Sequence, residues 1–407
     1  MKKICLFRLY VFLVCAEWFN DLSDPLSPLS VTQHYLLEKQ AIYAINLHNG
    51  SISKKKYKFP TAVLLFTTVF LPSCGHLSDK GGDTIHLDNI VKIENTDLAE
   101  STIAPGCYWQ MDIVGDSILV LNDRCNVEQQ FFHFYRLPDY HPVLSFGRIG
   151  QGPNEFGSMP FLVKSDSSHF FISEPHGVLK EFVWQENGLN EVKQMALFNP
   201  GARDISLEGA MAYGKNTTEG NGMIFSQPIY ESGGAVNWIG IPESIELSPL
   251  EKDNAQLLGD NSFAVNHEKR RIVSGMRHFN RVYVFDLDGT VIREIHIGLM
   301  SKKTDLIDPK SNFIAEEAPI YINGVASTDD YVYFIYYGKT FTEMDTAEGS
   351  GSSMILVFDW DGNHQKTLGI DGRIEAIAVS NDNHSVFLGR KDGADGLNRL
   401  LKYTVNK

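Results

Sequence analysis

The chain has 407 residues, of which 43% are hydrophobic and 21% charged, and it contains 34 glycines. This balance provides enough apolar side chains for a large buried core and excludes disordered, collagen-like and coiled-coil proteins. The formal net charge is −14. Because an acidic surface repels phosphate groups, we expect no nucleic-acid partner.

A targeting segment is predicted at residues 54–73. A basic stretch over residues 54–58 precedes a mostly apolar run from Phe59 to Leu71, which is followed by Pro72 and the small residue Ser73. This is the order of a secretory signal peptide. The run is shorter than the roughly 20 residues that a membrane-spanning helix needs, so a permanent transmembrane segment is the weaker interpretation.

Residues 71–74, Leu-Pro-Ser-Cys, resemble the lipobox of bacterial lipoproteins. The resemblance implies that Cys74 is acylated and that the residues before it are removed. Residues 74–83 then form a short tether. A signal peptide begins within a few residues of its basic region, so we interpret residues 1–53 as an extension that is either disordered or produced by a start assigned too far upstream. Residues 1–15 offer a competing signal, which Arg8 interrupts.

Three cysteines remain after such processing: Cys74, Cys107 and Cys125. If Cys74 carries lipid, Cys107 and Cys125 are the only pair left for an intrachain disulfide. An oxidising compartment would permit this bond. Two buried free thiols are the alternative.

From residue 84 onward the chain has an all-β pattern. Apolar and β-branched runs of four to eight residues are separated by Gly, Asp and Asn. Residues 282–295 and 355–368 repeat the order strand, Asp-x-Asp-Gly, strand. The Asp-Gly pairs predict type I′ hairpins. Each repeat follows another pair of strands, which indicates four-stranded propeller blades.

Six units of this size fit residues 84–407, and this predicts a six-bladed β-propeller. We place the units near residues 108–150, 158–198, 204–241, 256–298, 318–370 and 372–405. The last unit has three clear strands, and residues 84–93 have no blade of their own. We therefore expect the N-terminal strand to pair with the C-terminal blade, because closure removes an exposed edge. A pair of β-sandwich domains is the alternative.

A glycine-rich segment at residues 146–157 contains Gly-Pro-Asn-Glu-Phe. It resembles a segment of six-bladed β-propellers of the TolB-like and NHL-like kind, found in lipoproteins of Gram-negative gut bacteria. The resemblance implies this fold and an exported protein that is lipid-anchored in the outer membrane and faces the periplasm or the cell surface. From the residues themselves, the glycines indicate a connection between blades. Arg148 and Glu155 flank the turn and are candidate ligand-binding residues, unless they are solvated or pair with each other.

We assign no catalytic residue, metal ligand or cofactor. Residues 286–289 and 359–362 lack the further acidic ligands of a calcium loop, so we interpret them as hairpin turns. No His-Glu-x-x-His or Gly-x-Ser-x-Gly motif occurs. Aromatic residues are candidates for a glycan or peptide platform, although we expect most of them in the core. They are Tyr108, Trp109, Trp184, Tyr213, Tyr230, Trp238 and Tyr321.

Two functions from different classes fit these features. The preferred one is a non-enzymatic binding or scaffolding lipoprotein of the cell envelope that engages a protein, peptide or glycan and touches the membrane only through its lipid anchor. The alternative is a metal-dependent hydrolase or lyase with its site in the central funnel. Propellers host both classes, so the fold does not choose between them. Binding is preferred because the sequence shows no recognisable set of His, Asp and Glu residues converging on the axis.

Overall fold

The computed structural model describes most of the chain from Asp83 to Val405. The described residues are 83–93, 103–115, 117–125, 130–152, 154–165, 169–175, 177–185, 188–197, 203–215, 223–229, 236–298, 306–345, 352–391 and 397–405. The predicted signal peptide, Cys74 and nearly all of the predicted tether lie outside them. No helix in these ranges is both long enough and apolar enough to span a membrane.

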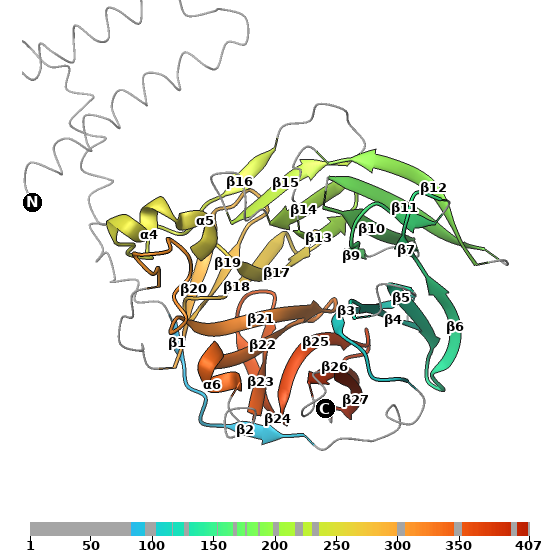
Figure 1. Cartoon of the computed structure of the whole chain (residues 1–407). Helices are drawn as coiled ribbons and strands as arrows, with labels where there is room; N and C mark the ends of the chain where they lie inside the picture. The colour runs from blue at the N-terminus through green and yellow to red at the C-terminus, as the bar shows by residue number, and fades with distance from the viewer. Residues whose placement is uncertain are drawn as a thin grey trace, which may run out of the picture. The chain divides into compact units, whose positions relative to one another are not determined.

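The described strands form six antiparallel blades arranged around one axis (Figure 1). Blade 1 contains β3 (Tyr108–Val114), β4 (Ile118–Asp123), β5 (Phe132–Arg136) and β6 (His141–Phe146). Blade 2 contains β9 (Phe161–Ser165), β10 (Phe170–Glu174), β11 (Val178–Gln185) and β12 (Gly188–Ala196). Blade 3 contains β13 (Arg203–Glu208), β14 (Met211–Lys215), β15 (Ile224–Pro228) and β16 (Asn237–Ile239).

The second half of the ring repeats this order. Blade 4 contains β17 (Asn261–Asn266), β18 (Arg271–Met276), β19 (Arg281–Phe285) and β20 (Val291–Ile297). Blade 5 contains β21 (Pro319–Ser327), β22 (Tyr331–Thr340), β23 (Ser352–Asp359) and β24 (His364–Asp371). Blade 6 contains β25 (Arg373–Val379), β26 (Ser385–Lys391) and β27 (Asn398–Thr404). The predicted all-β, six-bladed fold is confirmed, and the blades coincide with the six predicted units.

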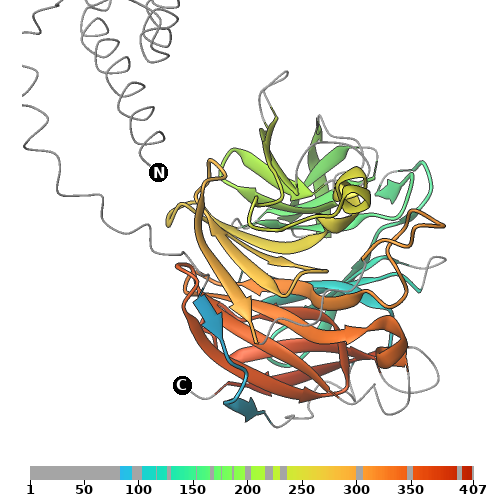
Figure 2. The same ribbon diagram turned by 90° about the vertical axis from the view of Figure 1, so that its left-hand side faces the viewer.

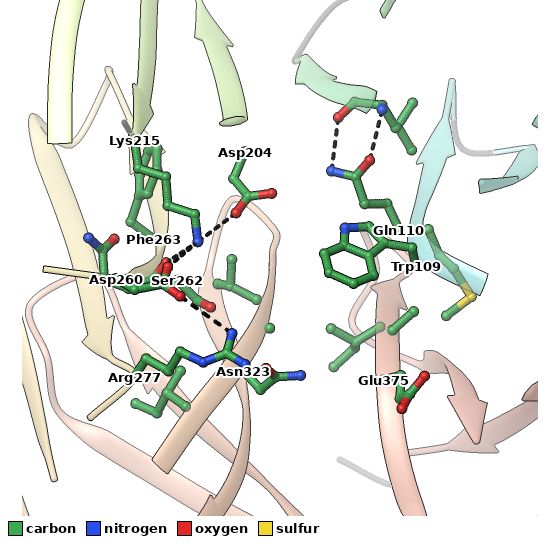
Figure 3. A pocket seen from close by; sticks show the side chains of 18 of the residues that line it. Trp109, Gln110, Asp204, Lys215, Asp260, Ser262, Phe263, Arg277, Asn323 and Glu375 are labelled. Carbon is green, nitrogen blue, oxygen red and sulfur yellow. Dashed lines mark hydrogen bonds and ion pairs between the residues drawn. The ribbon is translucent and has the colours of Figure 1, made fainter. Parts of the chain in front are cut away.

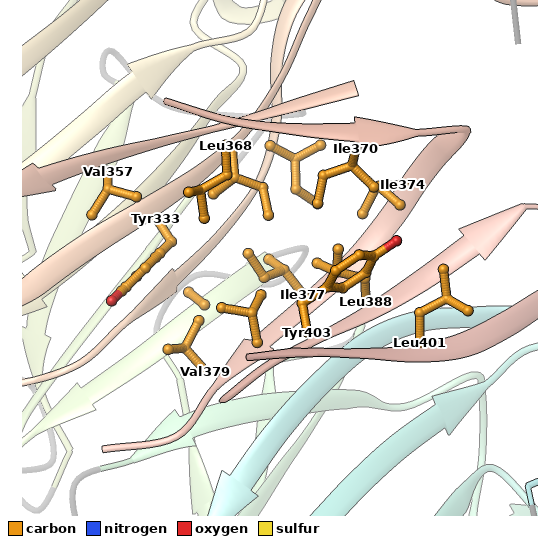
Figure 4. Close-up of a cluster of buried hydrophobic side chains, with 14 of the residues drawn as sticks. Tyr333, Val357, Leu368, Ile370, Ile374, Ile377, Val379, Leu388, Leu401 and Tyr403 are labelled. Atoms are coloured by element: carbon orange, nitrogen blue, oxygen red, sulfur yellow. The ribbon is translucent and has the colours of Figure 1, made fainter. Parts of the chain in front are cut away.

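Hydrophobic side chains fill the space between successive blades. Each of the six blade interfaces in the described residues contains its own buried cluster. Figure 4 shows the cluster between blades 5 and 6, which includes Tyr333, Leu368, Ile377, Leu388 and Tyr403. A middle strand is covered by a neighbouring blade on both faces, which explains why these strands are continuous apolar runs and not alternating patterns. Each fully buried Leu, Ile or Phe side chain contributes roughly 1.5–3 kcal/mol.

The first strand of each blade lies nearest the axis. These inner strands are β3, β9, β13, β17, β21 and β25, and they surround the centre of the ring in Figure 1. β9 and β13 also pair in parallel, which joins blades 2 and 3 into one eight-stranded sheet. We call the face of the disc at which the inner strands begin the cavity face. The second strand of each blade ends at this same face.

The N-terminal strand does not complete blade 6, so that part of the prediction is wrong. β1 (Asp83–Ile85) pairs in parallel with β20, and β2 (Ile90–Lys92) pairs in parallel with β24. Residues 83–93 therefore form a strap along the outer edges of blades 4 and 5 (Figure 2). The side chains of Ile85 and Ile93 pack against the clusters of these blades, which fixes the strap there.

Direct contact between the first and last blades closes the ring. β25 packs beside β3, and a two-way backbone bridge joins Gly106 to Asn398, with N···O distances of 3.1 and 2.6 Å. The side-chain amide of Asn398 also donates to the Tyr108 carbonyl at 2.9 Å. The residues just before β3 thus make the contact that the sequence assigned to the N-terminal strand.

The two Asp-Gly hairpins form, but with a different turn type from the predicted one. Of each pair, only glycine has a positive φ, +89° at Gly289 and +79° at Gly362. A type I′ turn requires a positive φ at both central residues. Instead, Gly289 N donates to Asp286 O at 2.9 Å, and Asp286 N donates to Thr290 O at 2.9 Å. This is a type I turn followed by a glycine bulge, which shifts the register of β19 against β20.

Within the described residues, three short helices occur that were not predicted. α4 (Pro249–Asp253) and α5 (Ala255–Leu258) lie in the connection from blade 3 to blade 4, and α6 (Phe341–Asp345) follows β22. Ser248 caps α4, because its Oγ accepts from Glu251 N at 3.3 Å while Ser248 N donates to the Glu251 carboxylate at 2.7 Å. Leu258 is fully buried and anchors this connection against residues 306–318.

Candidate functional site

A cavity of about 420 Å³ lies on the axis at the cavity face. Its lining includes residues from the inner strands of all six blades. Ligand sites in proteins usually measure roughly 300–1,000 Å³. The cavity is therefore large enough for a small ligand, and it is the candidate functional site.

Lys215 is the centre of an ion-pair network on one wall (Figure 3). It ends β14, and its Nζ lies 2.7 Å from Asp204 Oδ2 and 2.7 Å from Asp260 Oδ1. The same amino group donates to the carbonyl of Asn261 at 2.8 Å. These three acceptors satisfy all three of its N–H groups. The network joins blade 3 to blade 4, and Lys215 itself is buried.

The charges of this network stabilise one another. Burial by itself would lower the pKa of Lys215, but attraction to Asp204 and Asp260 outweighs it and raises the pKa above its ordinary value. Burial would raise the pKa of Asp260, but Lys215 and Arg277 together hold it below its usual range. Both groups are therefore charged at neutral pH. A lysine held in this state is not an activated nucleophile, which requires a lowered pKa.

Arg277 and Asp204 are members of this network that line the cavity. Arg277 follows the end of β18, and its Nη1 lies 3.5 Å from Asp260 Oδ2. Its guanidinium points toward the open centre in Figure 3. The Asp204 side chain is 40% exposed, and its backbone has a φ of +47°. A positive φ at a residue other than glycine is strained, and such strain concentrates at functional sites.

The opposite wall combines an aromatic ring with a second ion pair. Trp109, in β3, lines the cavity with 52% of its surface exposed. Arg124 lies over this ring, with Cζ 3.8 Å from the ring centroid. Burial lowers the pKa of Arg124 to about 10, with Asp204 opposing the shift. In β25, Arg373 Nη2 contacts Glu375 Oε1 at 3.1 Å.

Gln110 has a structural role beside Trp109. Leu162 N donates to Gln110 Oε1 at 2.8 Å, and Gln110 Nε2 donates to the Leu162 carbonyl at 3.3 Å (Figure 3). The side-chain amide thus imitates a paired strand residue and joins blade 1 to blade 2.

Arg148 and Glu155 form an ion pair outside the cavity lining. β7 (Arg148–Ile149) and β8 (Glu155–Phe156) are a short parallel pair, and Arg148 Nη2 lies 2.7 Å from Glu155 Oε1. Gly152 N donates to Glu155 Oε2 at 2.6 Å. This hydrogen bond, together with Arg148, lowers the pKa of Glu155. Neither residue is among those that line the cavity. Their observed contacts hold the glycine-rich loop together, and a ligand role for them stays a prediction.

Cys107 and Cys125 are joined in a disulfide, with Cα atoms 5.1 Å apart. The bond connects the residue before β3 to a residue just after β4. Asp123 Oδ1 accepts the backbone N–H of both cysteines at 2.9 Å. Asp123, Cys107 and Cys125 are also the one group in the described ranges with three side chains close enough to bind a metal ion. The disulfide uses both sulfur atoms, so it and a thiolate metal site exclude each other.

Among the aromatic candidates, Trp109 is the one that lines the cavity with an exposed ring. Tyr108, Tyr213 and Tyr321 are buried, as expected for core residues. Trp238 is partly buried against Phe225. Tyr230 and the side chain of Trp184 lie outside the described part of the chain.

Fold and site together define a six-bladed β-propeller with a polar axial cavity. Residues 301–382 match the family model described as TolB-like 6-blade propeller-like, which with the observed blades confirms the expected resemblance. A solved member of the DUF4221 family from Bacteroides vulgatus is similar, with a TM-score of 0.52 and 12% identity, over 78% of this chain and 96% of that one.

A second solved structure is the β-propeller domain of Cps50 (Swd1) from Myceliophteria thermophila. Its TM-score is 0.41 and its identity 11%, over 75% of this chain and 98% of that one. No curated protein matches the chain. At these identities the likeness to the DUF4221 protein supports the fold alone, so the function has to be argued from the site.

Proposed function

We propose that the protein is a non-enzymatic binding protein of the cell envelope and that the axial cavity is its ligand site. One observation carries the proposal: the cavity is open and ligand-sized, while its carboxylates are paired with cations. Asp204 and Asp260 contact Lys215, and Glu375 contacts Arg373. Carboxylates held in this way are positioned for recognition and are compensated in charge, unlike a free acid or base.

The alternative, a metal-dependent hydrolase or lyase, meets an obstacle in this pairing. A divalent cation at Asp204 and Asp260 would have to replace Lys215, which already satisfies them at 2.7 Å. Repulsion between the cation and the buried ammonium group would oppose its binding. The ligand classes that fit the proposal are a protein, a peptide or a glycan.

Export and lipid anchoring are part of the proposal. They are supported by the predicted signal peptide at residues 54–73, by Cys74 and by the disulfide between Cys107 and Cys125, a bond typical of oxidising compartments. Mass spectrometry of the native protein tests this part. We expect an acylated N-terminus at Cys74 that is lost in the Cys74→Ser variant, and a mature protein that retains residues 1–50 would contradict it.

Variants of exposed residues test the cavity as a ligand site. Trp109→Ala removes the exposed ring on the cavity wall, and Val192→Ala is the control, because Val192 is 51% exposed on the outermost strand of blade 2. Each protein is used to capture envelope proteins and is applied to glycan and peptide arrays. We expect captured ligands to be lost with Trp109→Ala and kept with Val192→Ala.

Metal analysis by plasma mass spectrometry separates binding from catalysis. We expect no stoichiometric divalent ion and a melting temperature that a chelator does not change. A bound ion with a chelator-sensitive melt would favour the hydrolase or lyase.

A further inference from the structure

The guanidinium of Arg277 is an incompletely paired cation in the cavity. In the described part of the chain its one ion-pair partner is Asp260, at 3.5 Å, which is too long for a good N–H···O hydrogen bond. The other oxygen of Asp260 accepts a hydrogen bond from Lys215 Nζ at 2.7 Å. The N–H groups of Arg277 are therefore available, and Figure 3 shows them directed at the cavity.

A second under-compensated cation lies behind the opposite wall. Nε and Nη2 of Arg124 are buried and have no hydrogen-bond partner. The group stacks between the rings of Trp109 and Phe161, at 3.8 and 4.9 Å from their centroids. A partly buried cation with two unpaired nitrogens adds positive potential on this side of the cavity, which Asp204 offsets in part. The lining itself holds three carboxylates and three cations, so Arg124 adds one further positive charge behind the wall that carries Trp109.

The groups between these two cations suit a ring that carries hydroxyl groups. Trp109 and Phe341 offer apolar rings that are 52% and 42% exposed. Ser206, Ser262 and Asn323 line the cavity and provide hydroxyl and amide groups. A sugar ring has an apolar face that can cover an aromatic ring and an edge of hydroxyl groups that needs polar partners.

We infer that the cavity binds an acidic sugar, a uronate residue of a glycan, with its carboxylate on Arg277 and its ring against Trp109. Arginine suits this task because its planar N–H groups match the two oxygens of a carboxylate. Figure 3 places the two residues on opposite sides of the open centre, so one ligand between them can touch both. The inference rests on the proposed function of the cavity and adds the chemical class of the ligand.

Calorimetric titration tests the carboxylate directly. The probes are trimers of galacturonic, glucuronic and mannuronic acid, each compared with its fully methyl-esterified and therefore uncharged form. We expect at least one acid to bind and its ester to bind roughly 10- to 100-fold more weakly, as expected for the loss of a charged hydrogen bond. Raising the salt concentration should weaken binding of the acid more than binding of the ester.

Paired arginine variants locate the contact. Arg277→Gln should weaken binding of the acid by the same factor and leave the ester unchanged, while Arg277→Lys should recover part of the loss. Arg270→Gln is the control, because Arg270 and Arg277 flank opposite ends of β18 and Arg270 is 61% exposed away from the cavity face. Circular dichroism and thermal melting confirm that each variant is folded.

The outcomes separate the two proposals. If acid and ester bind equally and both need Trp109, the cavity is a ligand site but recognition of a carboxylate is overturned. If peptides bind and no uronate binds, the proposed sugar ligand is wrong and a peptide replaces it. If no uronate binds at millimolar concentration and the envelope captures also fail, both proposals are wrong.

Discussion

Replacing Lys215 with methionine would show how much the ion network stabilises the junction of blades 3 and 4. The methionine side chain is of similar length but has no charge. It would leave Asp204 and Asp260 without the ammonium group that each contacts at 2.7 Å, and Asp260 would keep only the 3.5 Å contact with Arg277. The side chains of Lys215 and Asp260 are only 11% and 22% exposed, so water replaces little of the lost interaction.

The expected loss of stability follows from this burial. Removing one partner of a buried ion pair costs about 3–5 kcal/mol. Asp204 is 40% exposed, so solvent screens its interaction with Lys215. We therefore expect the variant to lose stability near the lower limit, about 3 kcal/mol. With an unfolding entropy of about 2.1 cal/mol/K per residue, a domain of this size should melt about 4 °C lower.

The difference in stability between the native protein and Lys215→Met should depend on pH at both ends of the range. The folded pKa of Asp260 is below its unfolded value, so its contribution is present above about pH 4 and is lost as pH falls through the folded pKa. The folded pKa of Lys215 is above its unfolded value, so its contribution is complete below about pH 10 and is lost as pH rises through the folded pKa. The difference between native protein and variant should be constant between these limits.

Scanning calorimetry and urea denaturation measure both quantities, with Lys252→Met, an exposed position on α4, as the control. A double-mutant cycle with Asp260→Asn isolates the pair energy. If Lys215→Met melts within 1 °C of the native protein at pH 7, the network does not stabilise the junction and the reasoning is refuted.

Two further changes concern the cavity face and the glycine-rich loop. Substituting Cys107 and Cys125 with serine should cost about 3 kcal/mol in urea denaturation, because the bond closes a loop with a sequence separation of 18; an unchanged midpoint would show that the bond does not form. Gly147→Ala should cost about 2–4 kcal/mol, because φ is +81° and the new Cβ would lie 2.5 Å from the ring of Phe156. Gly115→Ala has a similar φ but open space around it, so about 1 kcal/mol is expected, and equal losses at the two glycines would contradict the steric argument.

The blades could be predicted because each one repeats the same local signals. Apolar runs mark strands covered on both faces, and the Asp-Gly pairs mark hairpins. The place of residues 83–93 could not be predicted in this way. β2 is exposed at all three of its positions, so its sequence carries no burial pattern that would select one outer edge over another. The start of α4 was not predicted but could have been, since Ser248-Pro249-Leu250-Glu251 has the pattern of a capping box with proline at the first position.

The site was harder to predict than the fold because its parts are scattered. Lys215 and Asp260 are separated by 45 positions and meet only when blades 3 and 4 pack together. Each is an isolated charge in the sequence, with no motif around it. Tyr108 and Trp109 are neighbours, yet one is buried and the other is 52% exposed, since adjacent strand residues face opposite sides. The sequence therefore named Trp109 as an aromatic candidate but could not show that it faces the axis.

The strap formed by residues 83–93 determines where mechanical load enters the propeller. Tension applied through the N-terminal segment reaches the parallel ladders of β1 with β20 and of β2 with β24 before any other contact of the described domain. The ion pair of Asp83 with Arg293, at 2.6 Å, reinforces the first ladder. Both ladders lie on the outer edges of blades 4 and 5, away from the junction of blades 6 and 1 where the ring closes. A pull on the N-terminus would therefore act first on the rim of the disc and not on the contact that closes the ring.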